Sequence, residues 1–134
     1  MTASGDPWGQ WRNDAHPFWI NNDSRVVQFG VGCFAPYFQI SSDIRLKNNL
    51  KPIEDSVDKL SKLTGYTYDF KDSDKRRAGL VAQDVEKVLP EAVGENTEGY
   101  KTIEYSSVTA LLVNAVNALT KRVAELESKL QVAQ

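Results

Sequence analysis

The C-terminal part of the chain carries a heptad pattern of apolar residues, and this pattern constrains the fold more than any other feature. Apolar residues recur at alternating steps of four and three, at Leu112, Val116, Leu119, Val123, Leu126 and Leu130. This is the a/d spacing of a coiled coil, with valine or leucine at a and leucine at d. A helix over residues 106–133 is about 42 Å long at 1.5 Å per residue, too long for so small a domain to cover. We therefore expect helices of neighbouring chains to cover this stripe.

The charges beside the stripe favour parallel helices. Arg122 is a g residue and Glu127 is the e residue of the next heptad, so opposite charges meet between parallel neighbours. The pattern runs for under three heptads and does not choose three strands over two. An amphipathic helix that packs on its own domain is the alternative.

Composition changes sharply near residue 42. All three tryptophans and four of the five phenylalanines precede this point, whereas fourteen of the sixteen Lys and Arg residues lie from Arg45 onward. The change predicts two parts, residues 1–41 and residues 42–134, with the boundary between Ser41 and Ser42.

The first part, residues 1–41, is predicted to be β-rich with loops. Residues 24–32 alternate imperfectly and are rich in β-branched side chains, while Pro7, Pro17 and Pro36 interrupt any helix. The aromatic side chains of this part suit an interlocked core between three chains. An exposed surface for a host glycan or receptor is the alternative.

Ser42 and Lys47 are the candidate catalytic pair. A serine whose base is a lysine needs no histidine, and His16 is the only histidine of the chain. Spacing alone does not assign catalysis, because such a pair often arises by chance. The single Cys33 excludes an intramolecular disulfide and a cysteine-based metal site. We expect no metal ion and no cofactor.

Three separated runs carry a resemblance to a known family. They are Ser41 to Ile53 (SSDIRLKNNLKPI), Arg77 to Val93, and Gly99 to Leu119. In this order they resemble the intramolecular chaperone domain of endosialidase-type phage tailspikes. That domain is also found in phage tail fibres, in neck appendages and in the myelin regulatory factor group of membrane-tethered transcription factors. The resemblance covers about two thirds of the chain.

The resemblance implies that residues 42–134 trimerise and fold a phage tail fibre or spike and then release themselves. It implies cleavage between Ser41 and Ser42, with Ser42 as nucleophile and Lys47 as base, so that the chain is a self-cleaving serine endopeptidase. Residues 1–41 are then the β-rich end of the fibre. The implied partners are two further copies of the chain and the upstream fibre domains, with a host glycan or receptor bound through the parent fibre. The implied location is the virion, after synthesis in the host cytoplasm.

The cleavage chemistry can also be argued from the residues. The hydroxyl of Ser42 is adjacent along the chain to the carbonyl of Ser41 and can attack it through a five-membered ring, which gives an N-to-O acyl shift. A lysine amine is protonated at neutral pH, since its ordinary pKa is about 10.4. A lysine that acts as the base must therefore be desolvated or crowded by another cation.

The residues around the pair are candidates for a supporting role. Arg45 can supply the second cation, although in an extended segment both cations can be solvated on one face. Asp43 either orients the lysine or caps a turn. Asn48 and Asn49 are either donors to the oxygen of Ser41 or turn formers.

The segment between the pair and the last helix predicts a small α+β domain, because helices and strands mix without βαβ repeats. The expected elements are a helix over 52–64, strands over 66–70 and 78–82, a helix over 83–89 and a strand over 100–105. Pro52 suits the first position of its helix, and Gly65 suits the end. The two strands over 66–82 are expected to form a hairpin. Val85, Val88 and Leu89 are expected to face inward.

Charge and hydropathy exclude two classes of partner. The net charge of -2 and the absence of a basic patch argue against nucleic acid. No run of eighteen apolar residues exists, so we expect no membrane span. The alternative function is a non-cleaving module that trimerises a fibre tip or binds a receptor.

Overall fold

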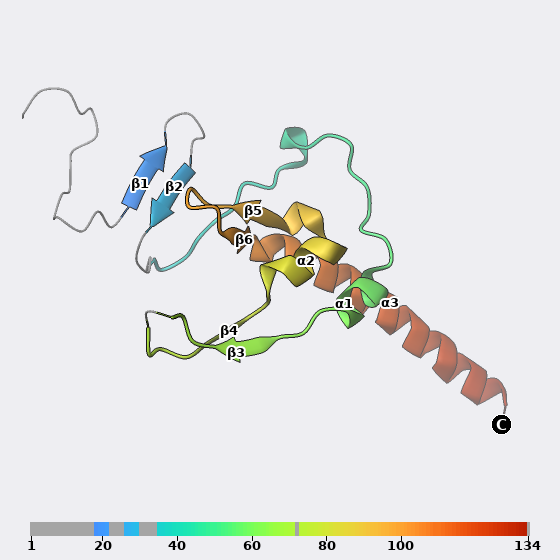
Figure 1. The fold of residues 1–134 in the computed structure, drawn as a ribbon. Coiled ribbons are helices and arrows are strands. Elements are labelled where there is room, and N and C mark those ends of the chain that lie inside the picture. The colour runs from blue at the N-terminus through green and yellow to red at the C-terminus, as the bar shows by residue number, and fades with distance from the viewer. Residues whose placement is uncertain (1–17, 22–25, 30–34, 72, 134) are drawn as a thin grey trace, which may run out of the picture. The chain divides into compact units, whose positions relative to one another are not determined.

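The structure is a computed structural model that describes residues 18–21, 26–29, 35–71 and 73–133. It divides into two compact units, residues 1–48 and 49–134 (Figure 1). The predicted boundary between Ser41 and Ser42 stays a prediction. Helices and strands are mixed without a parallel sheet among the described residues, which confirms the α+β class.

The first unit contains an antiparallel strand pair and a short 3₁₀ helix. Strand β1 spans Phe18–Asn21 and strand β2 spans Val26–Phe29, with Phe18 opposite Phe29. The helix η1 spans Ile44–Leu46. Short strands are predicted in this part of the chain, and β1 and β2 are such strands. His16, Cys33 and three of the aromatic residues of 1–41, Trp8, Trp11 and Phe34, lie outside the described residues.

The second unit contains a long helix and several short elements. In chain order they are α1 (Ser56–Ser61), β3 (Tyr66–Tyr68), β4 (Arg77–Gly79), α2 (Ala82–Val88), η2 (Pro90–Ala92), β5 (Val93–Glu95), β6 (Lys101–Ile103) and α3 (Tyr105–Val132). Strands β3 and β4 form one antiparallel pair, and β5 and β6 form another. Helix α1 packs against α3.

Helix α1 is shorter than the helix predicted over 52–64, and that prediction was wrong at both ends. Asp55, the residue before the helix, takes a left-handed conformation with φ 51°. A non-glycine residue in that region cannot continue a helix, so Pro52 lies outside it in irregular chain. At the other end Lys62 closes the helix, three residues before Gly65.

The β3–β4 hairpin confirms the predicted pairing but with shorter strands than expected. Tyr66 lies opposite Gly79 and Tyr68 opposite Arg77. Strand β4 ends early because Ala82 already begins α2. Gly79 lies against α3, where an added Cβ would come within 2.6 Å of Tyr105 Oη.

The α2 to β6 region confirms the buried face predicted for its helix and adds one strand that the sequence did not predict. Val85, Val88 and Leu89 are buried as expected. Strand β5 pairs with β6 over Val93 to Glu95, a segment in which no strand is predicted. The turn itself is held by Asn96, whose Oδ1 accepts hydrogen bonds from the backbone N–H groups of Glu98 and Tyr100.

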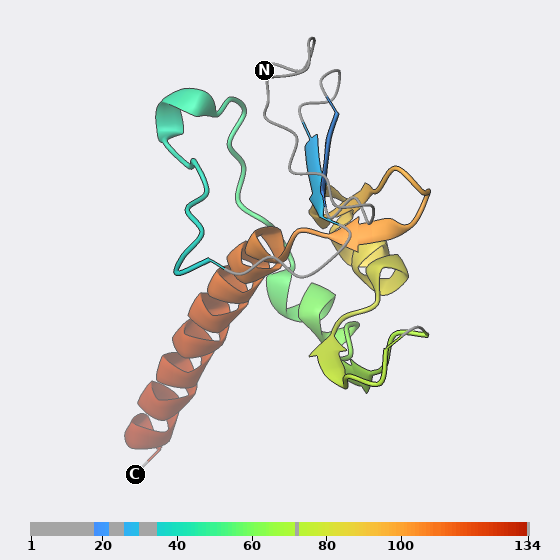
Figure 2. The ribbon, with the colours of Figure 1, turned by 90° about the vertical axis from the view of Figure 1, so that its left-hand side faces the viewer.

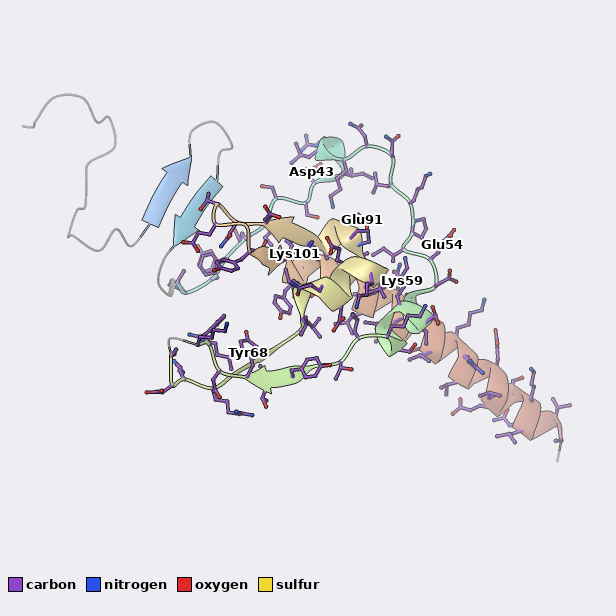
Figure 3. All side chains as sticks on the ribbon, in the orientation of Figure 1. Asp43, Glu54, Lys59, Tyr68, Glu91 and Lys101 are labelled. Atoms are coloured by element: carbon purple, nitrogen blue, oxygen red, sulfur yellow. The ribbon has the colours of Figure 1, made fainter. Side chains whose placement is uncertain are left out.

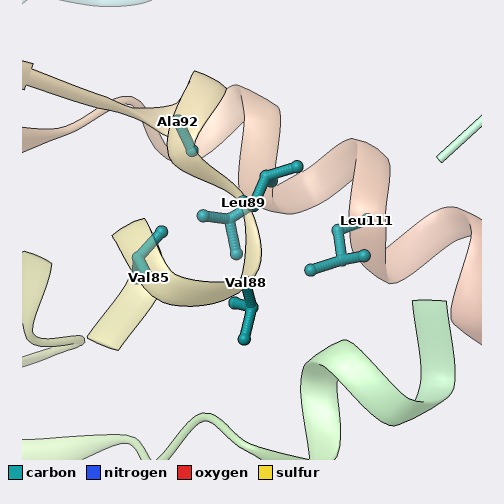
Figure 4. Close-up of a cluster of buried hydrophobic side chains, with 6 residues drawn as sticks. Val85, Val88, Leu89, Ala92 and Leu111 are labelled. Atoms are coloured by element: carbon teal, nitrogen blue, oxygen red, sulfur yellow. The ribbon is translucent and has the colours of Figure 1, made fainter. Parts of the chain in front are cut away.

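The core of the second unit lies where α2 and η2 meet the first part of α3 (Figure 4). Its buried residues are Val85, Val88, Leu89, Ala92, Val108 and Leu111. Leu111 is fully buried, and truncating such a leucine to alanine costs about 2–5 kcal/mol. This small cluster is therefore the main source of stability that the unit builds within one chain.

Helix α3 confirms the long helix predicted over 106–133. Its 28 residues make it about 42 Å long. Its buried residues are Val108, Leu111 and Ala115, all in its first half. The second half extends past α1 with no other element of the second unit beside it (Figures 1 and 2).

Candidate functional site

Ser42 and Lys47 lie at the two ends of one tight turn. Helix η1 spans Ile44–Leu46, with Asp43 directly before it and Lys47 directly after it. Lys47 Nζ donates a hydrogen bond to Ser42 Oγ at 2.6 Å. In extended chain, residues five apart are separated by about 17 Å, so the turn is what brings hydroxyl and amine together.

Asp43 begins this turn. Its Oδ1 accepts a hydrogen bond from the backbone N–H of Arg45 at 2.8 Å, which caps η1. Two backbone bonds close the turn, from Leu46 N to the Asp43 oxygen at 3.0 Å and from Lys47 N to the Ile44 oxygen at 3.1 Å. Of the two roles predicted for Asp43, capping a turn is the one this geometry shows.

Arg45 is paired with Asp43 rather than directed at the lysine. Its Nε donates to Asp43 Oδ1 at 3.0 Å and its Nη2 to Oδ2 at 2.8 Å. The side-chain and backbone hydrogen bonds from Arg45 lower the pKa of the Asp43 carboxyl, and the same carboxylate raises the pKa of Arg45. The neighbouring carboxylate offsets the positive field that Arg45 would otherwise exert on Lys47.

The turn is open to water in the single chain. Every residue from Ser41 to Leu50 is exposed, and Figure 3 labels Asp43 on this turn. Asn49 has a φ of 55°, the left-handed conformation that asparagine tolerates in turns. For Asn49 this geometry fits the turn-forming alternative, while the role of Asn48 stays a prediction.

The predicted a/d stripe of α3 is a second candidate surface. Its residues are 45–68% exposed: Leu112, Val116, Leu119, Val123, Leu126 and Leu130. The core side of α3, formed by Val108, Leu111 and Ala115, is separate from this stripe. The domain thus covers one side of the helix and leaves the predicted seam open.

An apolar hollow of about 670 Å³ in the second unit was not predicted from the sequence. Its aromatic lining comes from Tyr66, Tyr68, Phe70 and Tyr105, together with residues of β4 and β6. Tyr68 is labelled in Figure 3 on the hairpin that forms one wall. No local motif signals this hollow, because its residues come from separated segments that only the fold brings together.

Within the part of the chain that the structure describes, no helix combines the length and apolar character needed to cross a bilayer. The same residues contain no group of three or more His, Cys, Asp or Glu side chains arranged to hold a metal ion.

Known phage proteins are similar to most of the chain. The Long tail fiber protein Gp37 of Enterobacteria phage K3 is 50% identical over 129 residues, which is 90% of this chain and 10% of that protein. The protein of the same name from Enterobacteria phage T2 is 50% identical over 105 residues, covering 72% of this chain and 8% of its own length. The protein of the same name from Salmonella phage S16 is 36% identical over 124 residues, which is 84% of this chain and 17% of that protein. The chain therefore spans about a tenth of the length of the first two relatives.

A protein-family match covers the turn and the core-forming segment that follows it. Residues 42–94 match the family described as Chaperone of endosialidase. The match begins at Ser42, includes Lys47 and ends after the first residues of β5. The third run of the predicted resemblance, Gly99 to Leu119, lies beyond the matched range. Residues 42–94 thus match the family predicted from the sequence, which confirms the predicted resemblance over this segment.

Proposed function

We propose that this chain is an intramolecular chaperone that trimerises and folds the end of a phage tail fibre and then cuts itself off between Ser41 and Ser42. The 2.6 Å contact between Lys47 Nζ and Ser42 Oγ carries the proposal. This contact brings a lysine amine to the hydroxyl of Ser42, the first residue of the family match, and so supports Lys47 as base and Ser42 as nucleophile. The enzyme class is a self-cleaving serine endopeptidase that acts once.

The proposed reaction has two steps. Lys47, as the free amine, takes the proton of Ser42 Oγ while the oxygen attacks the carbonyl carbon of Ser41. The carbon–nitrogen bond then breaks, the nitrogen takes a proton, and the acyl group of Ser41 is left as an ester on Ser42. Water hydrolyses this ester, which leaves a carboxylate on Ser41 and restores the hydroxyl of Ser42, whose amino group was already freed in the first step.

Assembly would supply the desolvation of the lysine amine that the exposed turn lacks. An amine in water is held in its charged form, which donates a hydrogen bond but cannot accept a proton. Covering the turn with neighbouring chains would desolvate the amine and favour the uncharged base. Cleavage would then follow assembly, because only the assembled molecule would cover the turn.

The exposed stripe of α3 supports association of several copies. An apolar stripe of this length on a helix with no covering element is typical of a coiled-coil seam. In a parallel arrangement, the g residue Arg122 of one chain would meet the e residue Glu127 of the next. The proposed assembly is a parallel homotrimer, in keeping with the fibre context.

The relatives supply that context. Each is named a long tail fibre protein, and the chain matches only a small share of the first two. We propose that this chain is part of such a fibre, made in the host cytoplasm and located in the virion, with the upstream fibre domains as its folding substrate. Once the domain is released, the persistence of the fibre would depend on an unfolding barrier rather than on refolding.

A non-cleaving module that only trimerises a fibre tip is the second candidate function. The exposure of the whole Ser41 to Leu50 segment favours it, since no described residue desolvates the base. Binding of a host glycan or receptor through the parent fibre is compatible with either candidate.

Denaturing gel electrophoresis of the assembled protein separates the two candidates. We expect wild type to give two fragments, residues 1–41 and 42–134, and expect both Ser42→Ala and Lys47→Ala to stay full length. Mass spectrometry of the larger fragment should find Ser42 as its first residue. An assembled wild-type protein that stays full length at neutral pH refutes self-cleavage and leaves the passive module.

A further inference from the structure

Asn114 joins α3 to the segment that follows the Ser42–Lys47 turn. Its Nδ2 donates a part-buried hydrogen bond to the backbone oxygen of Ile53 at 3.2 Å, across 61 positions of sequence. Ile53 packs against the core cluster, and residues 50–54 form no helix or strand. A half-buried carbonyl outside regular structure needs a donor from elsewhere, and Asn114 supplies it.

The Asn114–Ile53 contact lies on the side of α3 that faces away from the predicted a/d stripe. With Leu112 at d and Val116 at a, Asn114 occupies the f position of the heptad, the position farthest from a coiled-coil seam. Association through the stripe therefore does not compete with this contact. A coiled-coil seam does not require asparagine at the f position. We therefore look for the role of Asn114 in its hydrogen bond to Ile53.

The chain between the turn and Ile53 is short. The six steps from Lys47 to Ile53 span at most about 20 Å when fully extended. Pro52 fixes its own φ and biases Lys51 toward extended backbone, which stiffens the end of this connection. Holding Ile53 on α3 thus limits the space that the Ser42–Lys47 turn can sample.

We propose that Asn114 is a positioning residue for self-cleavage: by holding Ile53 on α3, it makes the location of the Ser42–Lys47 turn depend on the helix through which the chains associate. The inference rests on the proposed self-cleavage and extends it to a residue outside the turn. Asn114 touches neither reacting atom and acts only through the connection over residues 48–52.

The test compares cleavage rate with solution mass in the full chain. Asn114→Ala is expected to slow cleavage about three- to tenfold, the rate equivalent of one ordinary hydrogen bond, while the solution mass stays that of wild type. Asn117→Ala is the matched control, because Asn117 is an exposed asparagine three residues further along the same helix. This control is expected to cleave at the wild-type rate.

A second variant separates positioning from simple support of the fold. Inserting Gly-Ser-Gly-Ser between Asn48 and Asn49 lengthens the connection and leaves residues 49–134 unchanged. The insertion is expected to slow cleavage by itself, and Asn114→Ala is expected to add little further loss in that background. A residue that only stabilised the fold would cause the same loss in both backgrounds.

Each outcome bears on a stated claim. Uncleaved wild type overturns the proposed function and this inference together. Cleaved wild type with an equally fast Asn114→Ala variant overturns the inference alone. Loss of assembly in Asn114→Ala, or equal losses with and without the insertion, also overturns it, since Asn114 would then support folding rather than position the turn.

Discussion

The ion pair between the Asp43 carboxylate and Arg45 stabilises the candidate catalytic turn. Arg45 lowers the pKa of the Asp43 carboxyl below its ordinary 3.8, so the ionised pair stabilises the turn at any pH above 3.8. That stabilisation is lost as the pH falls through the lower pKa of the folded turn. We expect an NMR titration of the Asp43 side chain in Ser42→Ala protein to give a midpoint below 3.8. In the Arg45→Gln variant the midpoint should rise toward the ordinary value; an unchanged midpoint would show that the pair does not form in solution.

Gly79 is required by its close approach to Tyr105. The Tyr105 hydroxyl accepts a hydrogen bond from Leu80 N at 3.0 Å, and a Cβ at residue 79 would lie 2.6 Å from that oxygen. We expect Gly79→Ala to lower the free energy of unfolding by about 1–3 kcal/mol, measured by urea denaturation, because either the hairpin or the Tyr105 side chain must move. Gly65→Ala is the control, since nothing lies within 4 Å of its added Cβ. Equal stability of both variants would contradict the close approach.

Single residues were predictable from the sequence to different degrees. Residue type makes Ser42 and Lys47 candidates, and the resemblance to the chaperone family is what gives them a catalytic role. It leaves Asp43 with two roles, since a cap is recognised only when the turn is known. It gives no sign of Asn114, whose partner Ile53 is distant in sequence and is bound through a backbone atom.

At the scale of elements, the apolar stripe of α3 is expected to govern association and not the fold of the domain. Its residues are exposed, so a charge placed there disturbs no described core contact. We expect the double variant Val123→Asp/Leu126→Asp to reduce the solution mass to that of one chain, measured by light scattering. Circular dichroism should still show the folded second unit.

Ala124→Asp is the control for this prediction. Ala124 is exposed on the same helix and lies at the b position, outside the a/d stripe, so the added charge should leave the solution mass unchanged. A double variant that keeps the wild-type mass would show that α3 does not join the chains.

Elements were predictable where periodicity is long and less so where it is short. The 28 residues of α3 carry many repeats of one pattern, and the prediction missed its bounds by one residue at each end. Helix α1 was overextended because the left-handed Asp55 has no signal in residue type. Strand β5 was missed because Gly94 and Glu95 favour a turn, and only the pairing with β6 makes them a strand.

At the scale of the whole molecule, the domain places two functions on separate parts of one chain. The first half of α3 completes the core, while the apolar stripe of the helix is exposed. The hydroxyl and amine lie together on one turn of a single chain. In the proposed mechanism, assembly would therefore cover the turn, whereas the contact between the two groups already forms within one chain.

This arrangement predicts that one chain supplies both catalytic groups. Ser42→Ala and Lys47→Ala chains can be co-expressed, and mixed assemblies can be isolated through a tag on one chain. In these assemblies no single chain carries both the Ser42 hydroxyl and the Lys47 amine. We expect these assemblies to stay uncleaved on a denaturing gel, because the 2.6 Å contact joins residues of the same chain.

Mixed assemblies of wild type and Ser42→Ala provide the control, since their wild-type chains should be cut and so prove that mixed assemblies are competent. Cleavage of the Lys47→Ala chain beside Ser42→Ala would contradict the prediction, because its Ser42 could only have been activated by the lysine of a neighbour. The turn would then have to open and re-form between chains, and the hydrogen bond seen within one chain would describe the state before assembly rather than the reacting one.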